Sequence, residues 1–231
     1  MIRFDLISAV PDLLESPLNH SIIRIARERG LAETHIHNLR DYSEDKHRKI
    51  DDYPYGGGAG MVLIPQPVFS CVESLQDQRK YDEVIFMTPD APQFTQKDAN
   101  RLSLSSNLMI ICGHYKGIDQ RIRDSIVTAE YSVGDFVLSG GELPALMVTD
   151  AVIRLIPGVL GDSESALSDS FMDDLLDAPA YTRPADFRGM RIPEVLTSGN
   201  HEKVREWRLS QSEEKTKQLR PDLYKLYKNK H

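Results

Sequence analysis

Residues 107–144 of this 231-residue chain read NLMIICGHYKGIDQRIRDSIVTAEYSVGDFVLSGGELP. Two apolar runs within them, Leu108–Cys112 and Ile126–Tyr131, predict buried strands, because short apolar runs bounded by glycine are typical of such strands. Each run leads into a glycine-bearing loop, GHYKG and SVGDFVLSGGELP respectively. Glycine lets a loop backbone approach a ligand closely, so this stretch predicts a binding pocket at the ends of two strands.

A third loop of the same kind, Thr88–Asp90, follows the apolar run Val84–Met87. Further segments alternate between the two patterns: strands are predicted at Ile2–Val10 and Ala32–Leu39, and helices from Pro17 to Gly30 and at Pro65–Gln78, Thr95–Ser103, Ile118–Asp124 and Glu142–Ile156. This alternation predicts an α/β fold, a mostly parallel sheet with helices on both faces. Ligands bind such sheets at the carboxyl ends of the strands, so we expect the three loops to line one pocket.

The chain changes character after the last of these helices. Residues 160–177 hold six acidic side chains and no basic one. We therefore predict a first domain at 1–159, an interdomain linker at 160–177 and a small helical C-terminal domain at 178–231. That last part carries a local charge of +5 in a chain of net charge −7. The asymmetry points to a polyanionic partner, but charge alone favours the simpler view that Lys and Arg solvate surface helices.

Several classes of protein and site are excluded. No apolar run is long enough to span a membrane, and the charged start is not typical of a secretory signal. Cys71 and Cys112 lie among apolar neighbours and predict buried free thiols in the cytoplasm. His35 and His37 share a strand face without a third ligand nearby, so we interpret them as surface or lining residues and predict no metal site. The glycine-rich segment Gly56–Gly60 lacks a phosphate-loop signature and is either a flexible connector or a loop shaped around a ligand.

Six motifs occur together and in order: PYGGGAGM, GHYKGIDQR, YSVGDFVLSGGELP, the triplet Asp169–Phe171, YTRP and LTSGNHEKVREWR. With them the chain resembles the bacterial tRNA (guanine-N1)-methyltransferases of the TrmD family, in the SPOUT class, from Met1 to about Tyr224. The resemblance implies a trefoil knot in the C-terminal part of the α/β domain and a homodimer whose sites are built from both chains. It also implies tRNA as the substrate, methylated at N1 of the guanosine at position 37, next to the anticodon.

The resemblance further implies that the strand-end loops bind S-adenosylmethionine as the methyl donor, largely through backbone groups. Carried over by motif, the cofactor-binding residues are Pro89, Gly113, Tyr115, Gly117, Ser132, Val133, Gly134, Asp135, Phe136, Val137, Leu138, Gly140, Gly141 and Pro144.

Guanine N1 carries a proton at neutral pH, so its methylation needs a base at N1 and a cation or donor at O6. The resemblance implies Asp169 as the base and Arg154 as the group at O6. From the residues alone, any of the six nearby acids could be the base, with Asp173 and Asp177 the nearest alternatives. Arg154 could equally pair with a carboxylate on an apolar helix. The candidate tRNA contacts in the C-terminal domain are Tyr181, Arg183, Lys203, Arg205 and Arg208.

The chain departs from the family pattern at three positions. Lys116 stands where Glu is usual, Phe136 where Tyr is usual, and Ala180 where His is usual. Lys116 reverses the charge beside the cofactor, which leaves the family's magnesium requirement open. The alternative function is a non-catalytic RNA-binding protein that senses the cofactor, and the presence of both Asp169 and Arg154 argues against it. A Rossmann-type small-molecule methyltransferase ranks low, since no glycine follows the first strand.

Overall fold

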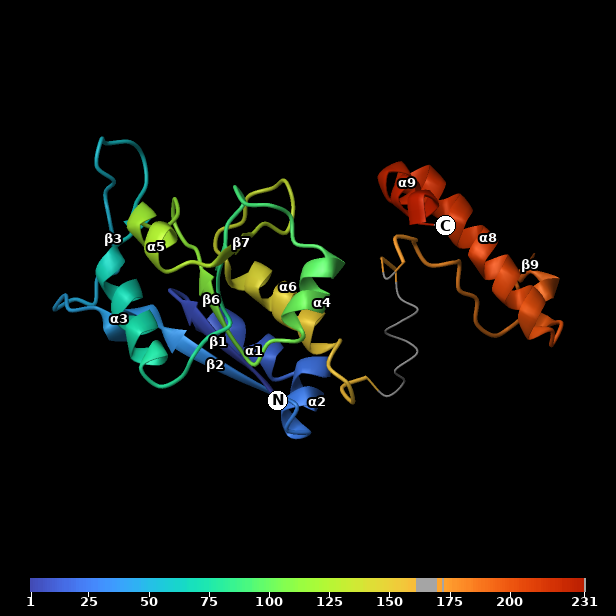
Figure 1. Cartoon of the computed structure of the whole chain (residues 1–231), viewed down its shortest axis with the longest axis horizontal. Helices are drawn as coiled ribbons and strands as arrows, with labels where there is room; N and C mark the ends of the chain where they lie inside the picture. The colour runs from blue at the N-terminus through green and yellow to red at the C-terminus, as the bar shows by residue number, and fades with distance from the viewer. Residues whose placement is uncertain (161–169, 172, 231) are drawn as a thin grey trace. The chain divides into compact units, whose positions relative to one another are not determined.

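The structure is a computed structural model that describes residues 1–160, 170–171 and 173–230 (Figure 1). The chain divides into two compact units, Met1–Gly161 and Asp162–His231. A separate linker at 160–177 stays a prediction, because most of that segment lies outside the described residues. None of the described helices is long and apolar enough to cross a membrane.

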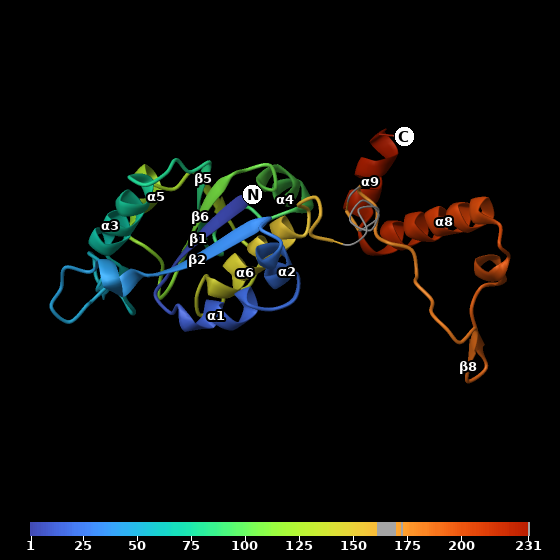
Figure 2. The ribbon, with the colours of Figure 1, turned by 90° about the horizontal axis from the view of Figure 1, so that it is seen from below.

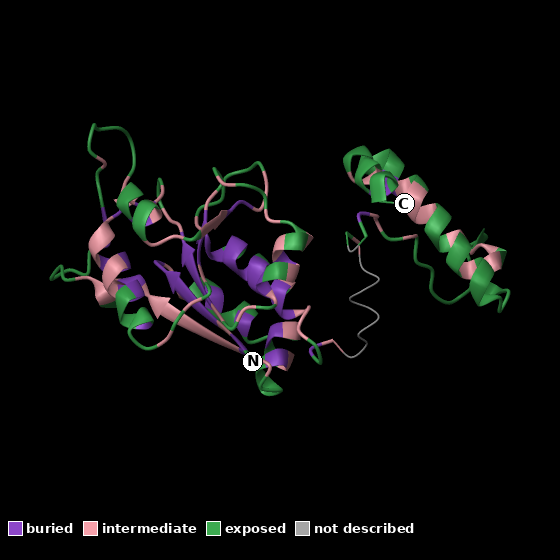
Figure 3. Cartoon of the chain, in the orientation of Figure 1, coloured by how far each residue is buried: buried purple, intermediate pink, exposed green. Residues whose placement is uncertain are grey.

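The first unit is built on a parallel sheet of five strands, as the alternating pattern predicts. The strand order is β2-β1-β6-β5-β7, and every neighbouring pair is parallel. The strands are β1 (Ile2–Ser8), β2 (Ala32–Asn38), β5 (Glu83–Met87), β6 (Asn107–Cys112) and β7 (Ala129–Tyr131). β1, β6 and β5 lie inside the sheet and are buried on both faces (Figure 3), which explains their nearly continuous apolar sequences.

Helices cover both faces of this sheet, so two apolar clusters form (Figure 2). One face carries α1 (Asp12–Leu18), α2 (Ser21–Glu28), α4 (Gln96–Leu102) and α6 (Glu142–Ile153). The other carries α3 (Pro65–Gln76), α5 (Gln120–Ser125) and the short 3-10 helix η1 (Leu39–Tyr42). Cys71 and Cys112 are buried free thiols, as predicted, and they lie on opposite faces of the sheet. Alternate side chains of each inner strand thus enter different clusters.

Some elements differ from the sequence-based prediction. One helix was expected from Pro17 onward, but Pro17 lies near the end of a separate helix, α1, and α2 begins only at Ser21. The strand expected at Ile126–Tyr131 is reduced to Ala129–Tyr131, because Ile126 and Val127 pack against the helix-covered cluster before the chain enters the sheet. The sequence did not predict the short hairpin of β3 (Asp51–Asp52) and β4 (Val62–Leu63).

The second unit contains a hairpin, a 3-10 helix and two helices: β8 (Asp186–Phe187), β9 (Met190–Arg191), η2 (Glu194–Thr197), α8 (His201–Leu219) and α9 (Pro221–Lys230). Asn200 caps α8, since its side-chain oxygen accepts from the backbone N–H groups of Glu202 and Lys203, each at 3.1 Å. The hairpin turns through Arg188 and Gly189, both with positive φ, as a two-residue hairpin turn requires.

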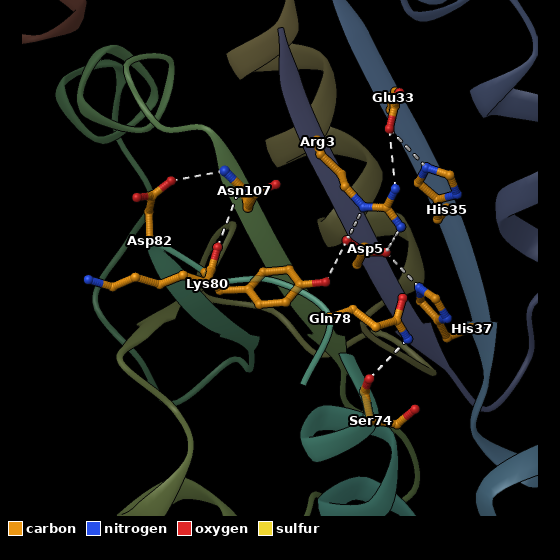
Figure 4. A network of polar contacts seen from close by, with 11 residues as sticks. Arg3, Asp5, Glu33, His35, His37, Ser74, Gln78, Lys80, Asp82 and Asn107 are labelled. Carbon is orange, nitrogen blue, oxygen red and sulfur yellow. Dashed lines mark hydrogen bonds and ion pairs between the residues drawn. The ribbon is translucent and has the colours of Figure 1, made fainter. Parts of the chain in front are cut away.

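Asp5 stands at the centre of a polar network beside the second apolar cluster (Figure 4). Its carboxylate is fully buried and accepts from Arg3 at 2.7 and 2.9 Å and from Tyr81 Oη at 2.8 Å. His37 Nε2 lies 2.7 Å from the same carboxylate. His37 is therefore a partner of a buried acid, a role that the sequence did not indicate, while His35 contacts Glu33 at 3.3 Å.

Burial raises the pKa of Asp5, but the hydrogen bonds from His37, Arg3 and Tyr81 outweigh burial and hold the pKa well below its ordinary range. A carboxyl group whose pKa is lowered in the folded state stabilises the fold above its unfolded pKa of about 4. That contribution is lost progressively as the pH falls from about 5 toward the folded pKa.

We expect Asp5→Asn to lower the free energy of unfolding by about 3 kcal/mol at neutral pH, because three donors lose a charged acceptor in a buried network. The difference between the two proteins should shrink as the pH falls from about 5 to about 2, since the carboxyl group of Asp5 then takes up a proton in the unfolded wild-type chain while it stays charged in the fold. Urea unfolding of both proteins across this pH range measures the difference in the free energy of unfolding. A difference that does not change with pH would contradict the lowered pKa of Asp5.

Candidate active site

A cavity of about 430 Å³ opens at the carboxyl ends of β5, β6 and β7. Its walls come from the three loops that follow these strands, beginning at Thr88, Gly113 and Ser132, and from the start of α6 at Pro144. The volume lies within the range of small-molecule sites. The position is where open parallel sheets bind ligands, because backbone groups at the strand ends are not all used by the sheet.

Backbone hydrogen bonds join the three loops to one another. Thr88 N–H donates to the carbonyl of Tyr131 at 3.0 Å, and Phe94 N–H donates to that of Ser132 at 2.8 Å. Gly141 N–H donates to the carbonyl of Gly113 at 2.6 Å. The walls of the cavity are therefore held in place by the protein itself, so that a ligand meets a largely formed site.

The hydrogen bond between Gly141 and Gly113 is the shortest of these three. A Cβ atom built at Gly141 would lie 2.6 Å from the backbone nitrogen of Gly113 and 2.9 Å from Cα of Cys112. Backbone atoms cannot give way as the end of a flexible side chain can, so only glycine fits. Nearby, Tyr115 has a φ of +58°, a strained conformation for a residue with a side chain, and such strain gathers at functional sites.

Arg123 ties the first loop to the sheet and to α5. Its guanidinium donates to Glu130 on β7 at 2.7 and 2.6 Å and to Asp90 at 2.9 Å, and it lies over the ring of Phe86. The hydrogen bond with Glu130 is the main reason why the pKa of Arg123 is raised. Hydrogen bonds from Thr88 and Arg123 lower the pKa of Asp90. Both Arg123 and Asp90 line the cavity.

The glycine-rich segment before β4 lies beside the GHYKG loop. Lys116 N–H donates to the carbonyl of Met61, and Leu63 N–H to that of Gly117, each at 3.0 Å. Gly60 packs against the side chain of Lys116, and its φ of +94° suits glycine. The end of the glycine-rich segment near Gly60 is thus joined to the wall of the cavity. Tyr55, which precedes the glycines, is fully exposed.

Comparisons with known proteins agree on one family. A family model described as tRNA (Guanine-1)-methyltransferase TrmD matches residues 2–226. A protein of Chlorobaculum tepidum named tRNA (guanine-N(1)-)-methyltransferase is 61% identical over 222 residues, 96% of each chain. Proteins of the same name from Bacteroides fragilis and Christiangramia forsetii are 57% and 56% identical over 96% of this chain and 99% and 98% of theirs. The chain belongs to the TrmD family.

Membership in the TrmD family confirms the resemblance, and most of the motif residues converge on the cavity. The predicted cofactor residues that line it are Pro89, Gly113, Tyr115, Gly117, Ser132, Val133, Phe136, Val137, Leu138, Gly140, Gly141 and Pro144. Gly134 and Asp135 belong to the same loop without lining the cavity. Asp135 accepts from Gln93 at 3.1 Å instead, so it holds the loop. That these residues bind the cofactor stays a prediction.

Four other lining residues were not named among the predicted cofactor contacts: Thr88, Asp90, His114 and Arg123. Thr88, Asp90 and His114 stand inside the strand-end loops that were expected to line the pocket, so their position after an apolar run was a usable signal. Arg123 had no such signal, because its role depends on Glu130 and Asp90 reaching it from other elements.

Of the two predicted catalytic residues, Arg154 belongs to the described part of the chain. Arg154 directly follows α6 and is partly exposed, and Asp169 lies outside the described residues. In the second unit, Tyr181, Arg183 and Arg208 line a groove of about 790 Å³. Lys203 and Arg205 are exposed on α8. The tRNA-binding roles of all five residues stay predictions.

The described walls of the cavity do not fit a magnesium site. Asp90 is the one carboxylate among the described lining residues, and it is already bound to Arg123 and Thr88. Lys116 adds a positive charge to the same wall. Magnesium is bound through oxygen ligands, usually carboxylates, and here the carboxylate of Asp90 is already taken by Arg123.

We expect Gly141→Ala to lower the free energy of unfolding of the first unit by about 2 kcal/mol, because the new methyl group overlaps backbone atoms that cannot move independently. Ser139→Ala, at an exposed position of the same loop, is the matched control and should change stability by less than about 0.5 kcal/mol. Urea unfolding measures both variants. Equal stability of Gly141→Ala and wild type would show that the loops do not depend on the close contact between Gly141 and Gly113.

Proposed function

We propose that the protein transfers a methyl group from S-adenosylmethionine to N1 of the guanosine at position 37 of tRNA, in the cytoplasm. The observation that carries the proposal is the convergence of motif residues from three separate loops on one preformed cavity. Membership in a family whose relatives are named tRNA (guanine-N(1)-)-methyltransferases supplies the reaction and the substrate.

The cavity has the chemistry that a nucleoside-derived methyl donor requires. Apolar side chains such as Val133, Leu138 and Pro144 line it and suit the flat face of an adenine ring. Glycines in the walls, such as Gly117 and Gly141, let the loop backbone come close to the polar edges of a ligand. S-adenosylmethionine, when bound there, supplies an electrophilic methyl group on a sulfonium sulfur.

The chain's own residues then act on the guanine. In the proposed reaction the bond between sulfur and the methyl carbon breaks as a bond between that carbon and N1 forms. Asp169 takes the N1 proton, which leaves N1 with the electron pair for the new bond. Arg154 stabilises the negative charge that collects on O6, because a guanidinium stays charged and donates in a plane. The products are 1-methylguanosine in tRNA and neutral S-adenosylhomocysteine.

We further propose the trefoil knot of the family. The approach of Gly141 to Gly113 supports it, because the loop that leads into α6 returns directly against the end of β6. No knot could be derived from the strand pattern, since threaded chains are rare.

We also propose a homodimer. Phe136 and Val137 beside the cavity are exposed, and so are Leu143 and Met147, which lie one turn apart on α6. Exposed apolar side chains gathered beside a site mark an interface more often than solvent-facing surface. A second copy of the chain bound to these four residues would complete the wall of the cavity.

The proposed activity is tested with tritiated S-adenosylmethionine and tRNA transcripts that differ only at position 37. We expect labelled 1-methylguanosine with guanosine there and no label with adenosine. Asp169→Asn should lower kcat by about 100-fold or more and leave the affinity for S-adenosylhomocysteine unchanged, because general-base catalysis is lost without change to the cavity.

Asp173→Asn is the matched control, an acid four residues away that should retain turnover. Cofactor and tRNA binding without any label would favour the alternative, a cofactor-sensing RNA-binding protein. Full turnover by Asp169→Asn would show that another group takes the proton.

We expect Met147→Glu to weaken the proposed dimer by about 100-fold, because the substitution places a charge in an apolar interface. Leu104→Glu, at a side chain that is 87% exposed elsewhere in the same unit, should leave the dimer intact. Sedimentation velocity over a range of concentrations measures both variants. A Met147→Glu protein that dimerises like wild type would place the interface elsewhere.

A further inference from the structure

Two buried polar atoms face each other behind the wall of the cavity. Glu142 Oε2 and His114 Nδ1 are both shielded from solvent, and within the described part of the chain neither has a hydrogen-bond partner. They lie 4.0 Å apart, which is about 1 Å too far for a hydrogen bond. Buried polar atoms in native proteins are nearly always paired, so an exception calls for an explanation.

Glu142 is held from the other side. It is the first residue of α6 and is 1% exposed. Its Oε1 accepts from Ser8 Oγ at 2.7 Å, while Ser8 Oγ itself accepts from Val10 N–H at 2.8 Å. The backbone donor at Val10 occupies the hydroxyl oxygen, so the single hydroxyl proton is directed at Glu142. The carboxylate is thereby fixed with Oε2 turned toward the GHYKG loop.

His114 connects this carboxylate to the cavity. Its ring packs edge-on against Tyr115, with centroids 4.7 Å apart and planes at 87°, and both residues line the cavity. Gly140 leaves room between the two buried atoms. A Cβ atom there would lie 2.2 Å from Glu142 Oε2 and 2.7 Å from His114 Nδ1. The strained backbone of Tyr115 thus lies one residue from a histidine that faces a buried acid.

We propose that Glu142 is a positioning residue of the cofactor site: when the cofactor binds, the GHYKG loop closes by about 1 Å and His114 Nδ1–H donates to Glu142 Oε2. The hydrogen bond fixes the His114 ring, and the edge-on contact fixes Tyr115 against the ligand. The proposal rests on the proposed function, because it takes the cavity to be the S-adenosylmethionine site. It adds a residue that does not line the cavity itself.

Asp5 provides an internal comparison. Asp5 and Glu142 are both buried acids of the first unit, each near a histidine. The carboxylate of Asp5 is bound by Arg3, His37 and Tyr81, as expected for an acid that serves stability alone. Glu142 keeps one oxygen without such a bond, and that oxygen points toward the loop of the proposed ligand site. The contrast assigns Glu142 to ligand binding.

The test is a double-mutant cycle on the affinity for S-adenosylhomocysteine, measured by calorimetry at a temperature where every variant is folded. Glu142→Gln and His114→Gln should each weaken binding by about tenfold, since each removes one charge-assisted hydrogen bond. The double variant should bind no more weakly than the weaker single variant, because both changes remove the same bond. If the double variant instead weakens binding by the product of the two single effects, the proposal is overturned.

Asp5→Asn is the matched control, because it removes a comparably buried acid far along the chain from the loop. It should lower stability and leave the affinity for S-adenosylhomocysteine unchanged. Equal weakening by Asp5→Asn and Glu142→Gln would reduce the role of Glu142 to general stability. Failure of the wild type to bind the ligand at all would instead contradict the proposed function, so the two failures are distinguishable.

Nuclear magnetic resonance of protein labelled with ¹⁵N at its seven histidines tests the bond without relying on a Glu142 variant. The His114 signal is identified by its loss in His114→Gln. Saturating S-adenosylhomocysteine should shift the Nδ1 resonance of His114 in the direction of a stronger hydrogen-bond donor. An Nδ1 resonance that does not move on binding would overturn the proposal.

Discussion

The constraint on which the site depends is the contact between two stretches of backbone, Gly141 and Gly113. A hydrogen bond of 2.6 Å joins them, and no side-chain atom fits between them. This contact sets the distance between the loop after β6 and the start of α6. The carboxylate of Glu142 and the ring of His114, the neighbours of these glycines, are brought face to face by it. A packed backbone contact of this kind transmits small shifts instead of absorbing them.

Much of the fold was predictable because its signals are local. The apolar runs at Glu83–Met87 and Asn107–Cys112 form strands at almost the predicted residues, and the C-terminal part is helical as predicted. The cavity was predictable in outline, since the ends of parallel strands meet at one edge. Helix and strand ends were less predictable: a helix was expected to begin at Pro17, but Pro17 lies inside α1 and the next helix begins at Ser21.

The missed parts of the site depend on contacts between residues distant in sequence. Arg123 gains its role from Glu130 and Asp90, on two other elements, and Glu142 is held by Ser8, 134 positions away. No local pattern distinguishes such an arginine or glutamate from one on the surface. The motif SGGELP does contain Glu142, but it gives no indication that the side chain turns inward. Burial supplies that information, and burial is a property of the fold.

The two units differ in how their sequences achieve stability. The first unit buries two large apolar clusters. Along the described residues from 170 to 230, the buried side chains are Asp174, Thr216 and Tyr227, while Leu209, Leu219 and Leu226 stay exposed. A unit that buries so little apolar surface gains little stability from its own core. Any partner that covered these leucines would add apolar burial and stabilise the folded unit by mass action.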